Sequence, residues 1–290
     1  MPRVDVHQHL WPPSFREALA RRDEPPRLTA GGRRLELREG TFDVDPAEDD
    51  LDRRLALLDR IGIDVAVVSP APTLETEEHD DLREAYHAGI PDVAAASNGR
   101  IAPLAAGEVR SGFAGACVSA AAFVSGVEPL LEGLASAGGF LFVHPGPPEP
   151  RPDSPPWWSA VVDYTAQMQA AFAAWVDRPA VAEVPVVFAI LGGGVPAQLE
   201  RLRARGVDVD AVLERTFFLD TASYGPEAVG LCLRSFGVEH VVFGSDAPVI
   251  DPGPTLAAVR SLGDDDFETI LSTNGTRLLG RGPQTAAGAR

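Results

Sequence analysis

Short apolar runs rich in valine, isoleucine and phenylalanine alternate along the chain with longer segments in which apolar residues recur every three or four positions. Most of the runs are apolar throughout, which is typical of strands covered on both faces in a parallel sheet. They predict eight strands, at residues 4–6, 65–69, 101–105, 115–119, 140–144, 186–191, 217–220 and 241–244.

The longer segments have the period of amphipathic helices. In residues 49–61, for example, Leu51, Leu55 and Leu58 fall on one face. The pattern predicts helices at residues 49–61, 76–96, 127–137, 165–176, 196–205, 226–236, 254–262 and 264–279. Eight strands alternating with helices predict an α/β fold, a (β/α)8 TIM barrel. We expect one domain over residues 1–280 and a disordered tail at 281–290.

Three connections depart from this regular pattern. Residues 105–115 leave no room for a crossover helix with its loops, so the third βα unit is predicted to be shortened. Residues 11–48 and 145–164 are long, proline-containing excursions that follow the first and fifth strands. Because long βα loops of barrels lie over the active-site mouth, we expect both excursions there.

The charge and the cysteine content of the chain exclude or disfavour several classes of function. The chain carries 42 acidic and 25 basic residues, for a net charge of −17, and all the basic residues are arginine. Schiff-base chemistry through lysine is therefore excluded, and nucleic-acid and membrane partners are disfavoured. Cys117 and Cys232 are too few for a disulfide framework. With no signal-peptide or membrane-spanning run, these features predict a cytoplasmic protein.

The strongest chemical signal is Asp5-Val6-His7-Gln8-His9, at the end of the first predicted strand. Residues i and i+2 of a strand point to the same side, so His7 and His9 project together at the mouth of the barrel. Two imidazoles on one face have the spacing of metal ligands. An ordinary pair of exposed or hydrogen-bonded histidines is the alternative.

Two further ligand-type residues follow strands five and eight. His144 ends the run Phe140-Leu141-Phe142-Val143, and Asp246 follows Val241-Val242-Phe243-Gly244-Ser245. Each alone has a structural alternative, a packed histidine for His144 and a helix N-cap for Asp246. Together with His7 and His9, they would place ligand-type side chains at one mouth.

These motifs resemble those of the amidohydrolase superfamily, in the branch that includes aminocarboxymuconate-semialdehyde decarboxylase and related metal-dependent hydrolases and decarboxylases. The matching segments are Val4-Asp5-Val6-His7-Gln8-His9, Leu141-Phe142-Val143-His144-Pro145-Gly146, Leu191-Gly192-Gly193 with Pro196, and Phe243-Gly244-Ser245-Asp246-Ala247-Pro248. The resemblance implies a barrel of the metallo-dependent hydrolase type. It also implies that His7, His9, His144 and Asp246 hold one divalent metal ion, usually Zn²⁺, with Asp246 as the catalytic base.

One position departs from the family pattern. The sixth strand of the family usually ends in a histidine just before Leu-Gly-Gly, but here Ile190 stands at that place. Isoleucine can neither transfer a proton nor hydrogen-bond an oxyanion, a loss on the order of 10²–10⁴ in rate. Asp246 could act alone, His79 or His87 could substitute, or the usual chemistry could be lost.

Other residues of the mouth loops are weaker candidates. The aromatic residues Trp11, Trp157, Trp158 and Tyr164 are predicted to bind an apolar or aromatic substrate. The decarboxylase branch uses an arginine for a substrate carboxylate, and the first excursion offers Arg27, Arg33, Arg34 and Arg38. Asp220, at the end of strand seven, could hydrogen-bond a ligand histidine.

The prediction from sequence is a metal-dependent hydrolase that cleaves a C–N or C–O bond of a small organic molecule with metal-activated water. One alternative is a metal-dependent, non-oxidative decarboxylase of a small carboxylic acid, with aromatic acids among the candidate substrates. The other is a catalytically silent barrel that binds a metal or ligand. The resemblance also makes a homodimer possible.

Overall fold

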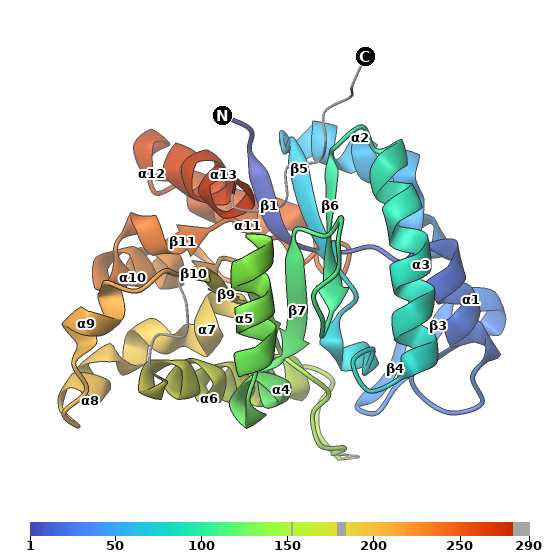
Figure 1. The fold of residues 1–290 in the computed structure, drawn as a ribbon, viewed down its shortest axis with the longest axis horizontal. Coiled ribbons are helices and arrows are strands. Elements are labelled where there is room, and N and C mark those ends of the chain that lie inside the picture. The colour runs from blue at the N-terminus through green and yellow to red at the C-terminus, as the bar shows by residue number, and fades with distance from the viewer. Residues whose placement is uncertain (152, 179–183, 281–290) are drawn as a thin grey trace.

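Eight parallel strands form a barrel at the centre of the protein, in the order β1-β5-β6-β7-β8-β9-β10-β11 (Figure 1). The computed structural model describes residues 1–151, 153–178 and 184–280, so the predicted tail at 281–290 lies outside the described residues. The strands are β1 (Val4–His9), β5 (Val65–Ser69), β6 (Ile101–Ala106), β7 (Gly115–Ser119), β8 (Phe140–His144), β9 (Val186–Phe188), β10 (Phe217–Asp220) and β11 (Val241–Val242). The fold is therefore the predicted (β/α)8 TIM barrel.

Backbone hydrogen bonds between the first strand and the segment around the last strand close the barrel. The Val6 N–H donates to the Phe243 carbonyl at 2.8 Å, and the His9 N–H donates to the Ala247 carbonyl at 2.8 Å. Phenylalanine rings from several strands, including Phe140, Phe142 and Phe217, fill the core and are almost fully buried. The histidine motif in β1 and the motif around Asp246, which lie at opposite ends of the sequence, are therefore adjacent in the structure.

Helices surround the strands, and most lie close to their predicted positions (Figure 1). These are α2 (Leu51–Ile61), α3 (Asp80–Ala96), α5 (Glu128–Ala137), α6 (Tyr164–Asp177), α8 (Leu199–Arg203), α10 (Pro226–Phe236), α11 (Pro252–Arg260), α12 (Asp264–Glu268) and α13 (Asn274–Leu279). The predicted helix at 264–279 is divided into α12 and α13 by a π-helical turn at Thr269–Thr273. Among the described residues, the pattern also left α1 (Pro13–Arg21), α4 (Ala120–Ser125) and α9 (Val209–Leu213) unpredicted.

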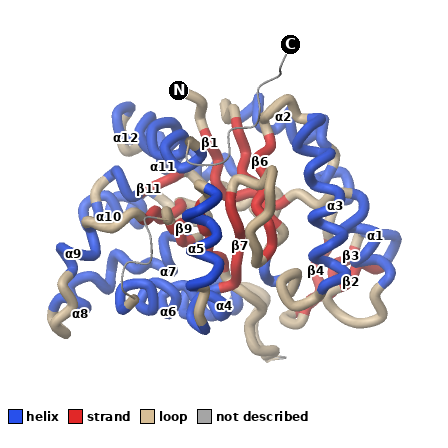
Figure 2. Tube along the Cα trace, viewed as in Figure 1, coloured by secondary structure: helices blue, strands red, loops and turns tan. Residues whose placement is uncertain are grey.

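The first excursion contains a small antiparallel sheet that the hydrophobic pattern did not predict. Its strands are β2 (Arg27–Thr29), β3 (Arg34–Leu37) and β4 (Gly40–Asp43), seen beside α1 in Figure 2. Leu37 pairs with Gly40, so Arg38 and Glu39 form the two-residue turn of the β3–β4 hairpin. Only Leu28 and Leu35 of this sheet are buried, too few to give a readable alternation.

The third βα unit is shortened as predicted: residues 107–114, all of them described, contain no helix between β6 and β7. The sixth strand is shorter than predicted and ends at Phe188. After it, α7 (Ile190–Gly194) is a left-handed turn in which φ is 48° at Ile190 and 74° at Gly194. Glycine adopts this conformation without strain, whereas isoleucine does so rarely.

The sequence analysis also expected no disulfide framework and no membrane-spanning segment. Cys117 and Cys232 are both free thiols in buried positions. Among the described residues, no helix combines the length and apolar character needed to cross a bilayer.

Candidate metal centre

The structure brings the four predicted ligand-type residues together at the C-terminal mouth of the barrel. Their nitrogen and oxygen atoms that could bind a metal all lie within 4.8 Å of one another. Asp246 Oδ1 is 3.4 Å from His7 Nε2 and 3.2 Å from His9 Nε2. The ring of His144 lies 5.0 Å from that of His7 and 5.2 Å from that of His9, between centroids.

Each histidine is held from outside the cluster through its Nδ1 atom. The acceptors are Asp220 Oδ2 at 2.8 Å for His7, the Ser69 carbonyl at 3.0 Å for His9 and the Pro145 carbonyl at 2.8 Å for His144. A carbonyl oxygen can only accept, so the Nδ1 atoms of His9 and His144 carry the hydrogen, and the Asp220 carboxylate favours the same tautomer of His7. In the neutral form of each imidazole, Nε2 then presents a lone pair. His7 Nε2 is buried and has no hydrogen-bond partner. This is the pattern of imidazoles that bind a metal through Nε2.

The charges around the cluster also favour a cation. Burial alone would lower the pKa of His7, but the carboxylates of Asp220 and Asp246 outweigh it and raise that pKa to about 9. Burial and the neighbouring imidazoles of His7 and His9 lower the pKa of His144. Burial opposes ionisation of Asp246, yet the histidines lower its pKa. The carboxylates of Asp220 and Asp246 thus favour a positive charge beside His7, at the centre of the cluster.

Buried polar residues that the sequence analysis did not single out fix the backbone of β1. The Asp5 carboxylate accepts hydrogen bonds from the His7 amide at 3.1 Å, the Gln8 side chain at 2.8 Å and the Ser245 amide at 3.0 Å. The Arg54 guanidinium, also buried, donates to Gln8 Oε1 and to the His9 carbonyl. Asp5 stands within the quoted histidine motif, and only its place there could have indicated this role.

Asp246 is positioned by an unusual backbone. Its φ is +61°, and its N–H donates to the His7 carbonyl at 2.8 Å. Aspartate tolerates the left-handed region better than most residues. It does not cap the next helix, because Asp251 caps α11 through the Gly253 amide. The helix-capping alternative is therefore wrong for Asp246.

Ile190 lies in the α7 turn, two residues after the end of β9, and neither proposed substitute joins the cluster. Its amide donates to Asp220 Oδ1 at 2.9 Å. His79 Nε2 lies 3.2 Å from Arg22 Nη2. His87 accepts a hydrogen bond from the Ala106 amide at 2.9 Å. Both histidines thus belong to other contacts.

A second group of side chains, Glu84, His87 and Glu108, also has its potential ligand atoms within 4.8 Å of one another. The Ala106 amide already occupies the lone pair of His87 Nε2, so a neutral His87 carries its hydrogen on Nδ1 and offers no second lone pair. Arg110 pairs with both glutamates. This group is an internally compensated charge cluster.

The predicted substrate-binding aromatic residues belong to the two long excursions. Of these residues, Tyr164 has a pKa that is affected by a charge of the cluster. Trp11 packs on Phe15, and Trp157 lies 6.0 Å from Trp158 between centroids. The pKa of Tyr164 is raised by burial first, then by Glu39, and also by the charge of Asp246. Among the described residues, no ring contact or hydrogen bond joins the three tryptophans to the cluster.

Three of the four candidate arginines have carboxylate partners. The pairs are Arg27 with Glu36 at 2.7 Å, Arg34 with Asp43 at 3.9 Å, and Arg38 with Glu75. The first two pairs lie within the small sheet. Arg38 instead bridges the hairpin turn to the β5–α3 loop, because Glu75 is a buried residue of that loop.

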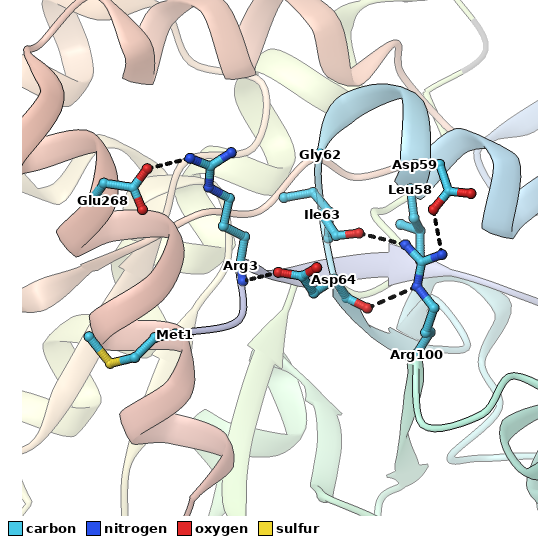
Figure 3. Close-up of a pocket in the computed structure, with 9 residues that line it drawn as sticks. All are labelled: Met1, Arg3, Leu58, Asp59, Gly62, Ile63, Asp64, Arg100 and Glu268. Atoms are coloured by element: carbon cyan, nitrogen blue, oxygen red, sulfur yellow. Dashed lines mark hydrogen bonds and ion pairs between the residues drawn. The ribbon is translucent and has the colours of Figure 1, made fainter.

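A hollow of about 450 Å³ lies elsewhere, among the N-terminal ends of β1, β5 and β6 (Figure 3). Its charged groups are paired with each other: Arg3 with Glu268, and Arg100 with Asp59 at 2.5 Å. That end of a barrel contributes to stability rather than catalysis. The hollow therefore does not compete with the mouth as the functional site.

Comparisons with known proteins agree with this geometry. A family model described as amidohydrolase matches residues 4–281. Among solved structures, IDCase of Metarhizium anisopliae is 19% identical with a TM-score of 0.80, each chain being covered to 97%. The 5-carboxyvanillate decarboxylase of Sphingomonas paucimobilis is 17% identical with a TM-score of 0.71, covering 96% of this chain and 99% of its own.

A dihydroxybenzoic acid decarboxylase from Polaromonas sp. JS666, solved with bound manganese and the inhibitor 2-nitroresorcinol, is 15% identical with a TM-score of 0.63. It covers 96% of this chain and 97% of its own. At such identities the likeness shows the fold. No curated protein matches the chain.

Proposed function

Because the chain belongs to the amidohydrolase family, we propose that it is a metal-dependent enzyme that removes CO₂ from a small, hydroxylated aromatic carboxylic acid. The observation that carries the metal dependence is the set of three imidazoles whose Nδ1 atoms are engaged outside the cluster, which leaves their Nε2 lone pairs facing Asp246. His7, His9, His144 and Asp246 would hold one divalent cation.

Either Zn²⁺ or Mn²⁺ suits this donor set. Three neutral imidazoles and a carboxylate are typical of Zn²⁺, which the sequence predicted. Imidazole and carboxylate ligands are also compatible with Mn²⁺, the metal bound in the Polaromonas decarboxylase. When bound, the cation would supply Lewis-acid polarisation of substrate oxygens.

Decarboxylation is preferred over hydrolysis on two grounds. Several proteins of the same fold are decarboxylases, among them the Sphingomonas and Polaromonas enzymes. In addition, Ile190 offers an apolar side chain where a hydrolytic site needs a group that activates water. Loss of CO₂ needs no attacking water, and the one proton transfer that it does need is the one that we assign to Asp246.

The reaction exchanges a carboxylate for a hydrogen. The C–C bond to the carboxylate breaks, its electron pair stays on the ring carbon, that carbon takes up a proton and CO₂ leaves. Asp246 is the acid–base group that we propose for this exchange, because a carboxylate can bind a cation through one oxygen and move a proton through the other.

Hydrolysis of a C–N or C–O bond is the second candidate. It is favoured by the position of Asp246 Oδ1 beside two imidazoles, where a carboxylate can act as a base. Labelled water separates the two reactions: hydrolysis incorporates ¹⁸O into a product, whereas decarboxylation releases CO₂ without incorporation.

The test is CO₂ release by the Zn²⁺- and Mn²⁺-loaded protein from a panel of mono- and dihydroxybenzoates. His144→Gln should abolish both metal binding and CO₂ release. His240→Gln is the matched control, because His240 is also buried and hydrogen-bonds a carbonyl through Nδ1, that of Phe217 at 3.1 Å, but lies outside the cluster. Metal binding without turnover of any acid, and without ¹⁸O incorporation from any ester or amide, would instead indicate a silent barrel.

A further inference from the structure

Arg54 of α2 is a buried cation whose hydrogen bonds reach the strand that carries two of the ligand-type histidines. The residue is 1% exposed. Its Nη1 donates to Gln8 Oε1 at 2.8 Å, and its Nη2 donates to the His9 carbonyl at 3.0 Å. Nη2 also donates to the Glu48 carbonyl at 3.0 Å, shortly before α2 begins. The guanidinium therefore joins the helix layer to β1.

The acceptors of Arg54 are neutral, although its side chain carries a charge. Among the described residues, no hydrogen bond joins this guanidinium directly to a carboxylate. Taking a charge out of water costs free energy, which neutral acceptors compensate less well than a carboxylate does. An apolar side chain in the same place would avoid that cost, so packing alone does not account for an arginine here.

Gln8 connects Arg54 to Asp5. Its Oε1 accepts from Arg54, and its Nε2 donates to Asp5 Oδ2 at 2.8 Å. Residues three positions apart in a regular strand point to opposite faces, but the pairing of β1 with β5 shifts register between Asp5 and Gln8, which lets the two side chains meet. Arg54, Gln8 and Asp5 thus form one buried hydrogen-bonded series, which we call the Arg54 chain.

The far end of the Arg54 chain ties together two segments that carry ligand-type residues. Asp5 Oδ1 accepts from the His7 amide at 3.1 Å and from the Ser245 amide at 3.0 Å. Ser245 directly precedes Asp246, whose own amide donates to the His7 carbonyl at 2.8 Å. A single carboxylate oxygen therefore sets the backbone of β1 against the segment after β11.

We propose that Arg54 is a positioning residue of the metal centre, and that the Arg54 chain holds the backbones of His7, His9 and Asp246 in place for the cation. The inference rests on the metal dependence of the proposed function. His144, the fourth ligand-type residue, is held separately. Ligands that are already in place bind an ion more tightly, because binding then orders fewer groups.

The experiment measures two properties that do not depend on turnover. One is the affinity for Zn²⁺, from competition with a chelating dye, and the other is the visible absorption of the Co²⁺-loaded protein, which reports the arrangement of the ligands. Arg54→Met removes the charge and the donors. It should weaken Zn²⁺ binding roughly 10- to 100-fold, as expected when an outer partner of the ligands is lost, and it should shift the Co²⁺ absorption bands.

Arg215→Met is the matched control for the loss of a buried arginine contact. Arg215 is partly buried and donates to the Trp175 carbonyl at 2.8 Å. It lies two residues before β10, at the opposite end of the barrel from the cluster. This variant should lower the unfolding temperature but leave the Zn²⁺ affinity and the Co²⁺ bands unchanged.

A double-mutant cycle tests whether Arg54 acts through Gln8. Gln8→Met leaves the charge of Arg54 in place and should also weaken Zn²⁺ binding and shift the Co²⁺ bands. In an Arg54→Met background, the same substitution should cost less affinity than it does in the wild type. Gln8→Met also carries the test if Arg54→Met does not fold.

The outcomes are distinct. An unchanged Zn²⁺ affinity and unchanged Co²⁺ bands in Arg54→Met, or in Gln8→Met where the first variant does not fold, overturn the positioning role and leave the proposed function intact. Fully additive losses in the double mutant overturn action through Gln8. A wild-type protein that binds neither Zn²⁺ nor Co²⁺ refutes the metal dependence of the proposed function, and this inference with it.

Discussion

The two oxygens of Asp220 hold different parts of the site. Oδ2 accepts from His7 Nδ1, and Oδ1 accepts from the backbone amides of Ile190 and Ala222. One buried carboxylate therefore sets the tautomer of a ligand histidine and also anchors the left-handed turn after strand six. The charge of Asp220 and the conformation of Ile190 are coupled through this single side chain.

Asp220→Asn should lower the affinity for Zn²⁺ or Mn²⁺ by roughly 10- to 100-fold, because it removes the negative charge behind His7 while keeping a similar shape. Equilibrium dialysis measures the change. Asp208→Asn, at the exposed N-cap of α9, is the control and should leave the affinity unchanged. Equal affinities of the Asp220→Asn and wild-type proteins would contradict this role.

Glu77 is a second residue whose pKa is strongly shifted by its surroundings. Its Oε1 accepts from the Ser119 amide at 2.6 Å, and burial raises its pKa to about 7 from the usual 4.5. Ser119 pairs in register with His144, so Glu77 lies over the neighbouring strand end at the mouth.

The stability that the neutral Glu77 carboxyl confers is complete below about pH 4.5 and is lost as the pH rises through 7. Glu77→Gln stays neutral, so it should match the wild type near pH 4.5 and exceed its free energy of unfolding at pH 8 by roughly 1 kcal/mol, after discounting for solvent screening. Urea unfolding at both pH values tests this. Glu200→Gln, on the exposed face of α8, should show no such pH-dependent gain.

At the scale of elements, the left-handed turn of α7 depends on its glycines. Gly193 has φ +70° and faces the Thr165 carbonyl, whereas Gly206 has φ +85° with no atom within 4 Å of an added Cβ. Gly193→Ala should therefore destabilise the protein by about 3 kcal/mol or more, and Gly206→Ala by only about 1 kcal/mol. Thermal or urea unfolding compares them, and equal losses would show that α6 does not constrain the turn.

The elements differ in how far the sequence could predict them. Strands β5, β7, β8 and β10 have the predicted bounds, because their continuous apolar runs are buried on both faces. The small sheet β2–β4 was missed, since its strands are short and largely exposed. Helix α1 was missed because the prolines at its start suggested a loop, although proline is favoured in the first turn of a helix.

The residues of the candidate site also differ in how far the sequence could predict them. Residue spacing within β1 and the strand ends predicted that His7, His9, His144 and Asp246 would converge. The contacts of Glu39 and Arg54 could not be predicted, because each joins loops or layers whose relative positions only the folded chain defines. The sequence analysis proposed that Asp220 could hydrogen-bond a ligand histidine, and in the structure Asp220 Oδ2 accepts from His7 Nδ1 at 2.8 Å.

At the scale of the molecule, the cation should link the two halves of the barrel. Removal of the metal with a chelator should lower the unfolding temperature, and a free cation concentration a hundred times Kd should restore about 2.7 kcal/mol of stability. Differential scanning calorimetry measures the shift with Zn²⁺ and with Mn²⁺. His144→Gln should abolish the shift and His240→Gln should keep it; a shift that survives in His144→Gln would place the bound ion elsewhere.

The closure of the barrel between β1 and the segment after β11 has a consequence for synthesis. The Asp5 carboxylate accepts from the Ser245 amide across 240 residues, and His7 meets Asp246 beside it. During translation, the two histidines of β1 leave the ribosome about 240 residues before Asp246. A nascent chain that has not yet reached Asp246 cannot bring the four ligand-type side chains together, so the candidate metal centre can form only after that residue has emerged.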